Sequence, residues 1–269
     1  MNKYIHLLIA GLIALGLIGC YSSSTNQGAV GVERKQFMML SSEEMDKGAL
    51  QAYAKMMGDA KKKHVYNNDT QTAYRIKRIL NELIPHTAVF RQDALKWKWE
   101  VNLIDSKQLN AWCMPGGKMA FYSGLIHSLK LNDAQIAAIM GHEMGHALRE
   151  HSRERASRNY ATSATISIAA QLLGLGGGVS SLANQVADVT FNLPNSREAE
   201  READRIGIEL AARAGYDPKE SVGVWQKMAK LSKSHPPEIL STHPIYKNRI
   251  ADLQKYSRVV EPLYLAARK

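Results

Sequence analysis

The chain has 269 residues, of which 45% are apolar, 22% charged and 7% aromatic. This composition is too apolar for a disordered chain and too mixed for a polytopic membrane protein, and two cysteines are too few for a disulfide framework. Thirty-five Lys and Arg against 25 Asp and Glu give a net charge of +10, which raises nucleic acid as a partner.

The first twenty residues predict the compartment. A basic start at residues 2–4 precedes an apolar run over 5–18, which is shorter than the roughly 20 residues of a membrane span and fits the core of a secretory signal. The run ends at Cys20 and resembles a bacterial lipoprotein signal, so we expect a signal peptide over 1–19 and lipidation of Cys20. Tyr21, where Asp would favour retention at the inner membrane, predicts an outer-membrane anchor facing the periplasm. The alternative is an ordinary signal peptide with an incidental cysteine.

Residues 20–44 are predicted to be a lipidated, flexible tether, because they are rich in Ser, Gly, Gln and Asn and show no sustained period. A single folded domain is expected over 45–269. Helical spacing starts this domain and gives way, from Trp97 to Leu103, to an alternation typical of a half-buried strand. Further extended stretches are predicted over 109–114 and 118–122. The expected fold is therefore α+β and mainly helical, with a small three-stranded sheet.

The most apolar stretch after the signal runs from 161 to 175 and is followed by glycines. It is too short and too polar to span a membrane. A buried core helix is the favoured interpretation for this part of the 161–191 segment. A lid hinged at the glycines and a membrane-facing hairpin are the alternatives.

The chemistry is indicated by His142-Glu143-Met144-Gly145-His146, on a helix predicted to start at Asn132. Residues four apart lie on one helix face, so both imidazoles can reach one metal ion. Glu143 is poorly placed as a ligand but can accept a proton from a water on the metal, as in H-E-x-x-H zinc peptidases. Gly141 and Gly145 weaken the helix, which predicts that another element packs very close to it.

A catalytic zinc ion needs a third protein ligand. The nearest rival to a distant carboxylate is His151, five residues after His146. The extended metzincin pattern requires Gly and His at positions that are Arg149 and Ser152 here, so that class is excluded.

The better candidate for the third ligand lies on a helix predicted to start near Asn195. Glu200 and Asp204 fall on its buried side, one turn apart, and buried acids are costly unless they are paired or bind a metal. Glu200 as a ligand, with Asp204 accepting from a ligand imidazole N–H, accounts for both. Glu198 and Glu202 are predicted to be solvated.

Four motifs in order resemble the HtpX-like zinc metallopeptidases, gluzincins of metallopeptidase family 48, over residues 45 to 255. The motifs are Asn110-Ala111 with Pro115-Gly116-Gly117, the H-E-x-x-H helix, Ser196-Arg197 with Glu200 and Asp204, and His243-Pro244 with Arg249-Ile250. The layout is most similar to the small bacterial lipoprotein branch. The resemblance implies a zincin-type domain with one zinc ion per chain on His142, His146 and Glu200, and base catalysis by Glu143.

The same resemblance implies further site residues. The strand after Pro-Gly-Gly would lie beside the cleft and pair with substrate, with Asn110, Gly116 and Gly117 as substrate-binding residues. His243 and Arg249 would approach the zinc. Either they stabilise the oxyanion, or His243 occupies the fourth zinc position as a latch that substrate displaces.

The resulting expectation is a zinc endopeptidase that is lipid-anchored in the bacterial envelope and cleaves misfolded or unassembled envelope proteins. The alternative is a latched or non-catalytic chaperone for the same proteins. Nucleic-acid binding lacks a recognised module, and the predicted compartment argues against it. Cys113 is expected to be buried and inert.

Overall fold

The computed structural model describes residues 21–172, 182–231, 238–244 and 248–268. The predicted signal peptide and the lipidation site Cys20 lie outside these residues. The helices are α2 (Ser42–Lys62), α3 (Thr70–Leu83), α4 (Ser123–Ser128), α5 (Asp133–Leu148), α6 (His151–Leu172), α7 (Leu182–Phe191), α8 (Arg197–Arg213), α9 (Glu220–Leu231), α10 (Ile239–Thr242) and α11 (Arg249–Ala267). The strands are β1 (Tyr21–Ser22), β2 (Gln36–Phe37), β3 (Glu100–Ile104), β4 (Ala111–Met114) and β5 (Lys118–Tyr122), and 3-10 turns cover Ile84–Val89, Gln92–Lys96 and Pro115–Gly117.

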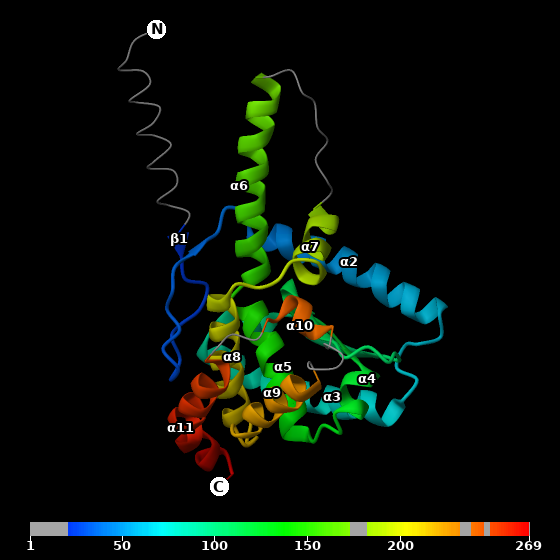
Figure 1. Ribbon diagram of the computed structural model, residues 1–269, viewed down its shortest axis with the longest axis vertical. Coiled ribbons are helices and arrows are strands. Elements are labelled where there is room, and N and C mark those ends of the chain that lie inside the picture. The colour runs from blue at the N-terminus through cyan, green and yellow to red at the C-terminus, as the bar shows by residue number, and fades with distance from the viewer. Residues whose placement is uncertain (1–20, 173–181, 232–237, 245–247, 269) are drawn as a thin grey trace.

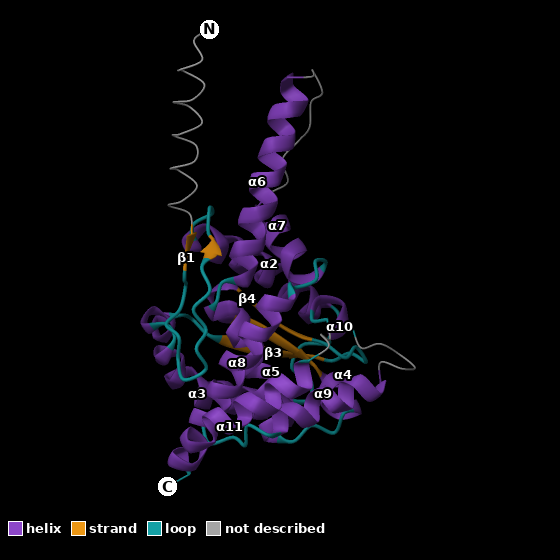
Figure 2. Cartoon of the chain, turned by 60° about the vertical axis from the view of Figure 1, so that its left-hand side comes forward, coloured by secondary structure: helices purple, strands orange, loops and turns teal. Residues whose placement is uncertain are grey.

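Three strands form a small mixed sheet in the order β3-β5-β4, so the predicted α+β class is confirmed. β5 lies in the centre, parallel to β3 and antiparallel to β4. Figure 2 shows the sheet between α2 and α7 on one side and α3 and α5 on the other. The prediction of a half-buried strand is wrong, because α2 covers the polar face of β3: Asn102 is buried and donates to the hydroxyl of Tyr53 at 2.7 Å.

α5 is the central helix and crosses α8 at very close range. A methyl group on Gly141 would lie 2.7 Å from the carbonyl oxygen of Gly207, and one on Gly145 would lie 2.9 Å from the carbonyl oxygen of Ala203. Only glycine permits such an approach of two backbones. The close packing predicted from the two α5 glycines is therefore confirmed, and it brings the acidic face of α8 to the histidines of α5.

The ends of these two helices follow from their capping residues. Asn132 and Gln135 form a reciprocal capping box at the start of α5, as predicted. The cap of α8 is Ser196, whose hydroxyl accepts from the amide of Ala199, and not Asn195 as predicted. The side chain of Asn195 is instead used inside the molecule, where it accepts from Arg155 at 2.6 Å.

The segment from Tyr21 to Ser41 lies on the folded body, so the prediction of a flexible tether over 20–44 is wrong for the described residues. β1 and β2 pair antiparallel, and Val30, Val32, Phe37 and Met38 are buried. The amide of Val30 donates to Glu209 at 3.1 Å. These apolar side chains, scattered among Gly and Ser residues, supply the burial that orders the segment. We call residues 21–41 the N-terminal strap.

α6 extends well beyond the other described elements in both views (Figures 1 and 2). The favoured prediction of a buried core helix over 161–175 is wrong for the part up to Leu172, because the backbone there projects away from the body. The glycines that follow lie outside the described residues. In the described part of the chain, no helix combines the length and apolarity needed to cross a membrane.

Candidate metal centre

Four buried side chains converge where α5, α8 and the end of α10 meet. They are His142 and His146 from α5, Glu200 from α8, and His243 just after α10, and each offers one ligand atom within 4.8 Å of the others. The three residues predicted as zinc ligands are thus brought together by the structure. His243 joins them as a fourth.

The spacing of these atoms fits a zinc ion. His142 Nε2 lies 3.1 Å from His146 Nε2 and 3.2 Å from His243 Nδ1. Glu200 Oε1 lies 3.3 Å from His146 Nε2 and 3.0 Å from His243 Nδ1. Ligands at the usual zinc distances, arranged tetrahedrally, are about 3.3 Å apart. Three imidazole nitrogens and a carboxylate oxygen so placed form the donor set that zinc prefers.

The side of His142 that faces away from the centre is held by a carboxylate. Its Nδ1 lies 2.9 Å from Asp204 Oδ1, the contact predicted from the sequence. This contact places the imidazole proton on Nδ1 and leaves the Nε2 lone pair free for a metal. Arg249 binds Asp204 at 2.7 Å and Glu200 at 3.0 Å, and its guanidinium stacks on Trp225 at 3.2 Å.

Arg249 therefore lies behind the two acids. It does not line the pocket that contains Glu143. That place fits an arginine that orients Glu200 and Asp204 better than one that contacts a reacting carbonyl.

A second network holds His146, and it was missed from the sequence. His146 Nδ1 lies 2.8 Å from His151 Nδ1, and His151 Nε2 lies 2.9 Å from Glu202. The prediction that Glu202 is solvated is wrong: it is buried and also binds Arg34 of the strap at 2.8 Å and Arg149 at 3.2 Å. His151, considered above as a rival ligand, instead supports a ligand.

The electrostatics of the centre suit a bound cation. Burial alone would raise the pKa of Glu200, but attraction to His243 and Arg249 outweighs burial and keeps the pKa well below its usual range. Burial lowers the pKa of His146 well below its usual value, so its imidazole is neutral, as a metal ligand must be.

Glu143 points into a narrow pocket beside the four converging atoms. The pocket is lined by His146, His243, Trp112 and Cys113, among others. Burial raises the pKa of Glu143, which moves a carboxylate towards the range of a general base. His243 Nε2 lies 3.5 Å from Glu143 Oε1. Cys113 is a free, buried thiol whose pKa is raised by burial, in agreement with the expectation that it is inert.

The strand beside this pocket is β4, not β5. The prediction that the strand after Pro-Gly-Gly pairs with substrate is wrong, because β5 has β3 on one side and β4 on the other. β4 has no strand on its second side among the described residues. Asn110 accepts from the amide of Tyr122 at 3.1 Å, so the antiparallel alternation turns the backbone N–H and C=O of Cys113 towards the open edge.

The other predicted substrate-binding residues lie around β4. Asn110 precedes the strand, and its side chain accepts from the amide of Ala111. Gly116 and Gly117 form the turn to β5 with φ of +72° and +77°, and a methyl on Gly117 would lie 2.6 Å from Trp99. Neither glycine lines the pocket with Glu143. The turn explains why glycine is needed there, and substrate contact by these residues stays a prediction.

Comparison with known proteins places this arrangement in a family. The model of peptidase family M48 matches residues 70–257, which include both metal-binding helices, β4 and His243. The chain belongs to peptidase family M48. The family resemblance read from the motifs is therefore confirmed, and M48 metallopeptidases use zinc.

Several M48 proteins are similar to this chain. It is 35% identical to the mitochondrial metalloendopeptidase OMA1 of Arabidopsis thaliana over 62% of this chain and 33% of that protein. It is 29% identical to the OMA1 of Saccharomyces cerevisiae over 75% of this chain and 56% of that protein. It is 28% identical to the beta-barrel assembly-enhancing protease of Escherichia coli K12 over 73% of this chain and 41% of that protein. The chain thus spans between a third and somewhat over half of the length of these relatives.

Proposed function

We propose that the chain is a zinc endopeptidase of the bacterial envelope that hydrolyses misfolded or unassembled envelope polypeptides. The observation that carries the proposal is the convergence of His142, His146 and Glu200 beside the buried carboxylate of Glu143. Such a set, with three zinc ligands and an adjacent base, supports hydrolysis of an amide bond. The M48 relatives are named as endopeptidases, which supports the same reaction.

The protein's own groups would act as follows. When bound, zinc lowers the pKa of a coordinated water and polarises a carbonyl group. Glu143, with its raised pKa, takes a proton from the attacking water and delivers it to the leaving amine. The open edge of β4 holds the substrate backbone as an added strand, with the C=O of Cys113 as an acceptor, while the N–H of Cys113 donates to Glu143. Burial of the site excludes bulk water and strengthens these interactions.

His243 would act as a latch in this proposal. Its Nδ1 lies 3.0 Å from Glu200 and 3.2 Å from His142, so it occupies the fourth corner of the ligand set. A catalytic zinc site needs that corner for water or substrate. His243 would have to swing away before the reaction.

The substrate class and the location rest on other observations. The E. coli relative is named for enhancing the assembly of β-barrels, which supports envelope polypeptides as substrates. The apolar run that ends at Cys20 supports anchoring by lipid, and Tyr21 after it supports the outer membrane, with the active site in the periplasm.

The deciding experiment compares the wild-type chain, Glu143→Gln and His243→Ala on an unfolded model protein, at matched zinc content. We expect wild type to cleave it and Glu143→Gln to lose at least a hundredfold in rate, because it cannot accept the proton. His243→Ala should be faster than wild type if the latch limits the rate. If neither the wild type nor zinc-loaded His243→Ala cleaves the protein, the peptidase proposal fails and the chaperone alternative is favoured.

A further inference from the structure

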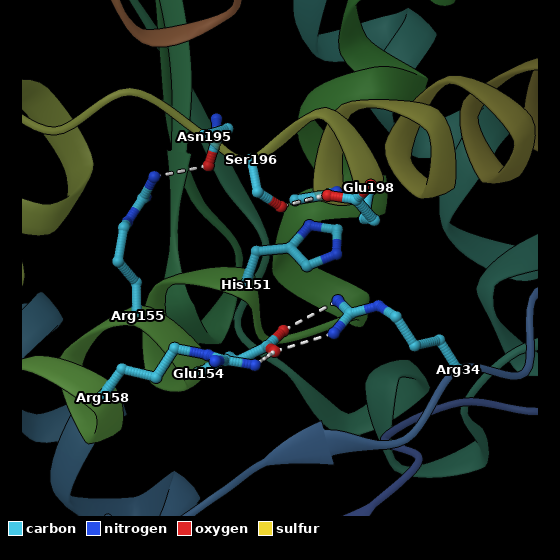
Figure 3. A pocket seen from close by; sticks show the side chains of 9 residues that line it. Arg34, His151, Glu154, Arg155, Arg158, Asn195, Ser196 and Glu198 are labelled. Carbon is cyan, nitrogen blue, oxygen red and sulfur yellow. Dashed lines mark hydrogen bonds and ion pairs between the residues drawn. The ribbon is translucent and has the colours of Figure 1, made fainter. Parts of the chain in front are cut away.

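A second, larger pocket opens beside the metal centre. It has a volume of about 350 Å³ and is lined by Arg34, His151, Glu154, Arg155, Arg158, Asn195, Ser196, Glu198 and Ala199. Figure 3 shows these side chains converging from the strap, α6 and the start of α8. Arg155 and Asn195 also line the pocket that contains Glu143 and His243, so the two pockets share a wall.

The charges in this second pocket do not balance. Arg34 and Arg158 both bind Glu154, at 2.7 Å and 2.9 Å. Glu198 binds Arg201 at 2.9 Å. In the described part of the chain, Arg155 has no carboxylate within ion-pair distance. Its guanidinium donates to two neutral oxygens, the carbonyl of Leu193 at 3.2 Å and the side-chain oxygen of Asn195 at 2.6 Å.

Keeping the Arg155 guanidinium without a carboxylate partner costs free energy. It is largely removed from water, and its Nε atom is buried without a hydrogen-bond partner. Burial, only partly offset by attraction to the more distant Glu200 and Glu154, lowers the pKa of the guanidinium to about 10, so it keeps its charge at neutral pH. A buried cation is normally compensated by a carboxylate that accepts from its planar fork of N–H groups. Here the fork borders a cavity large enough to admit one.

We infer that this pocket is a subsite that binds a carboxylate of the polypeptide substrate through Arg155. The inference rests on the proposed function, since it assigns a preference to the same site. The N-terminus of α8, capped by Ser196 at the pocket wall, carries a partial positive charge and also favours a bound carboxylate. The carboxylate comes either from an Asp or Glu side chain near the scissile bond or from the C-terminus of the chain being cut. Both sources present the same group to the fork.

The test measures binding, which does not depend on turnover. The zinc-loaded Glu143→Gln protein is titrated with short fluorescent peptides in which one Glu is moved along an otherwise uncharged sequence, each paired with its Gln counterpart. Every pair is made with a free and an amidated C-terminus. We expect one Glu position, or the free C-terminus, to bind on the order of tenfold more tightly than its neutral counterpart, the size of a charge-assisted contact.

Variants on the same background identify the residue. Arg155→Gln should remove the preference, and Arg155→Lys should retain part of it, because an ammonium keeps the charge but not the fork. Arg158→Gln is the matched control: it lies in the same pocket on the same helix, is mostly exposed and is already paired, so the preference should persist.

Equal binding of all charged and neutral pairs would overturn the inference, and so would a preference that survives in Arg155→Gln. If Arg155→Gln does not fold or does not retain zinc, an undiminished preference in Arg155→Lys overturns the role of the fork. A carboxylate preference without cleavage by either the wild-type chain or His243→Ala would contradict the proposed function and leave the subsite intact. Cleavage without any carboxylate preference would support the proposed function and overturn the subsite.

Discussion

At the scale of single residues, the Nδ1 atoms of the two α5 histidines contact different partners. Asp204 holds His142 and lies on the same helix as Glu200, whereas the partners of His146 run through His151 and Glu202 to Arg34 on the strap. Both partnerships leave Nε2 of the histidine facing the centre. A ligand imidazole oriented in this way binds metal more tightly than a free one.

The contact between Asp204 and His142 gives a first prediction. Asp204→Asn should weaken zinc binding by about 10–100-fold, because an amide holds the His142 imidazole less firmly and no longer compensates Arg249. Competition with a chelator measures the affinity. Asp252→Asn is a suitable control. Asp252 and Arg205 form another ion pair between α11 and α8, but this pair does not contact the ligands. Equal zinc affinity of Asp204→Asn and wild type would show that this contact has no part in holding the metal.

The sequence revealed one of these partnerships and not the other for a physical reason. Glu200 and Asp204 are one turn apart on an apolar helix face, so local spacing alone places them inside. Glu202 lies on another face, where spacing predicts exposure. Its burial depends on Arg34, 168 residues earlier in the chain, and long-range pairing of that kind leaves no local pattern.

At the scale of elements, the crossing of α5 and α8 sets the distance between the histidines and Glu200. The crossing is close because Gly141 faces Gly207 and Gly145 faces Ala203. The helices, their glycines and the cap of α5 could all be predicted, since they follow from local sequence. The order of the strands could not, because β3, β4 and β5 all read as short extended stretches and only their pairing makes β5 central.

The glycine crossing gives a second prediction. Gly141→Ala should destabilise the protein by about 1–3 kcal/mol, because the added methyl meets backbone that cannot move without separating the helices. It should also lower zinc affinity. Gly58→Ala is the control: that glycine lies in α2 with nothing within 4 Å, so the substitution should be neutral or stabilising. Denaturant unfolding of both variants checks the difference, and a Gly141→Ala protein as stable as Gly58→Ala would contradict it.

At the scale of the whole molecule, the metal centre joins parts of the chain that are far apart in sequence. Zinc bound there should stabilise the fold, because the unfolded chain cannot assemble the four ligands. We expect the melting temperature to rise with free zinc, each tenfold increase above the dissociation constant adding about 1.4 kcal/mol. Glu200→Gln should need a much higher zinc concentration for the same rise, because only the three histidines remain as ligands. Glu198→Gln, which alters an exposed carboxylate on the same helix, should keep the wild-type response. A response in Glu200→Gln like that of wild type would argue against Glu200 as a ligand.

The strap contributes to stability through buried charge, which makes its contribution depend on pH. Burial opposes ionisation of Glu154, but hydrogen bonds from Arg34 and Gln36 outweigh it and lower its pKa from 4.5 to about 2. A lowered carboxylate pKa stabilises the folded state above the unfolded pKa, and that stabilisation is lost as pH falls from about 4.5 to about 2.

Arg34→Gln should therefore cost about 2 kcal/mol or more at neutral pH, because two buried acids lose a partner. The deficit should shrink as the pH falls through this range, where Glu154 becomes protonated in both proteins. Unfolding of the zinc-free proteins at several pH values measures it. Arg158→Gln removes an exposed partner of the same acid and should have little effect. A deficit that does not change with pH would exclude the ionic explanation.

The ordered strap also limits how the molecule meets its substrates. Tyr21 already belongs to β1, so whatever precedes it joins the body at a defined point, beside α6 and not at the end of a long leash. If residue 20 is held at a membrane, as proposed above, the pocket that contains Glu143 stays within the length of the folded body from that surface. On that proposal, a polypeptide that stays at the same membrane surface meets the pocket more often than one that diffuses freely through the surrounding fluid, however similar their sequences.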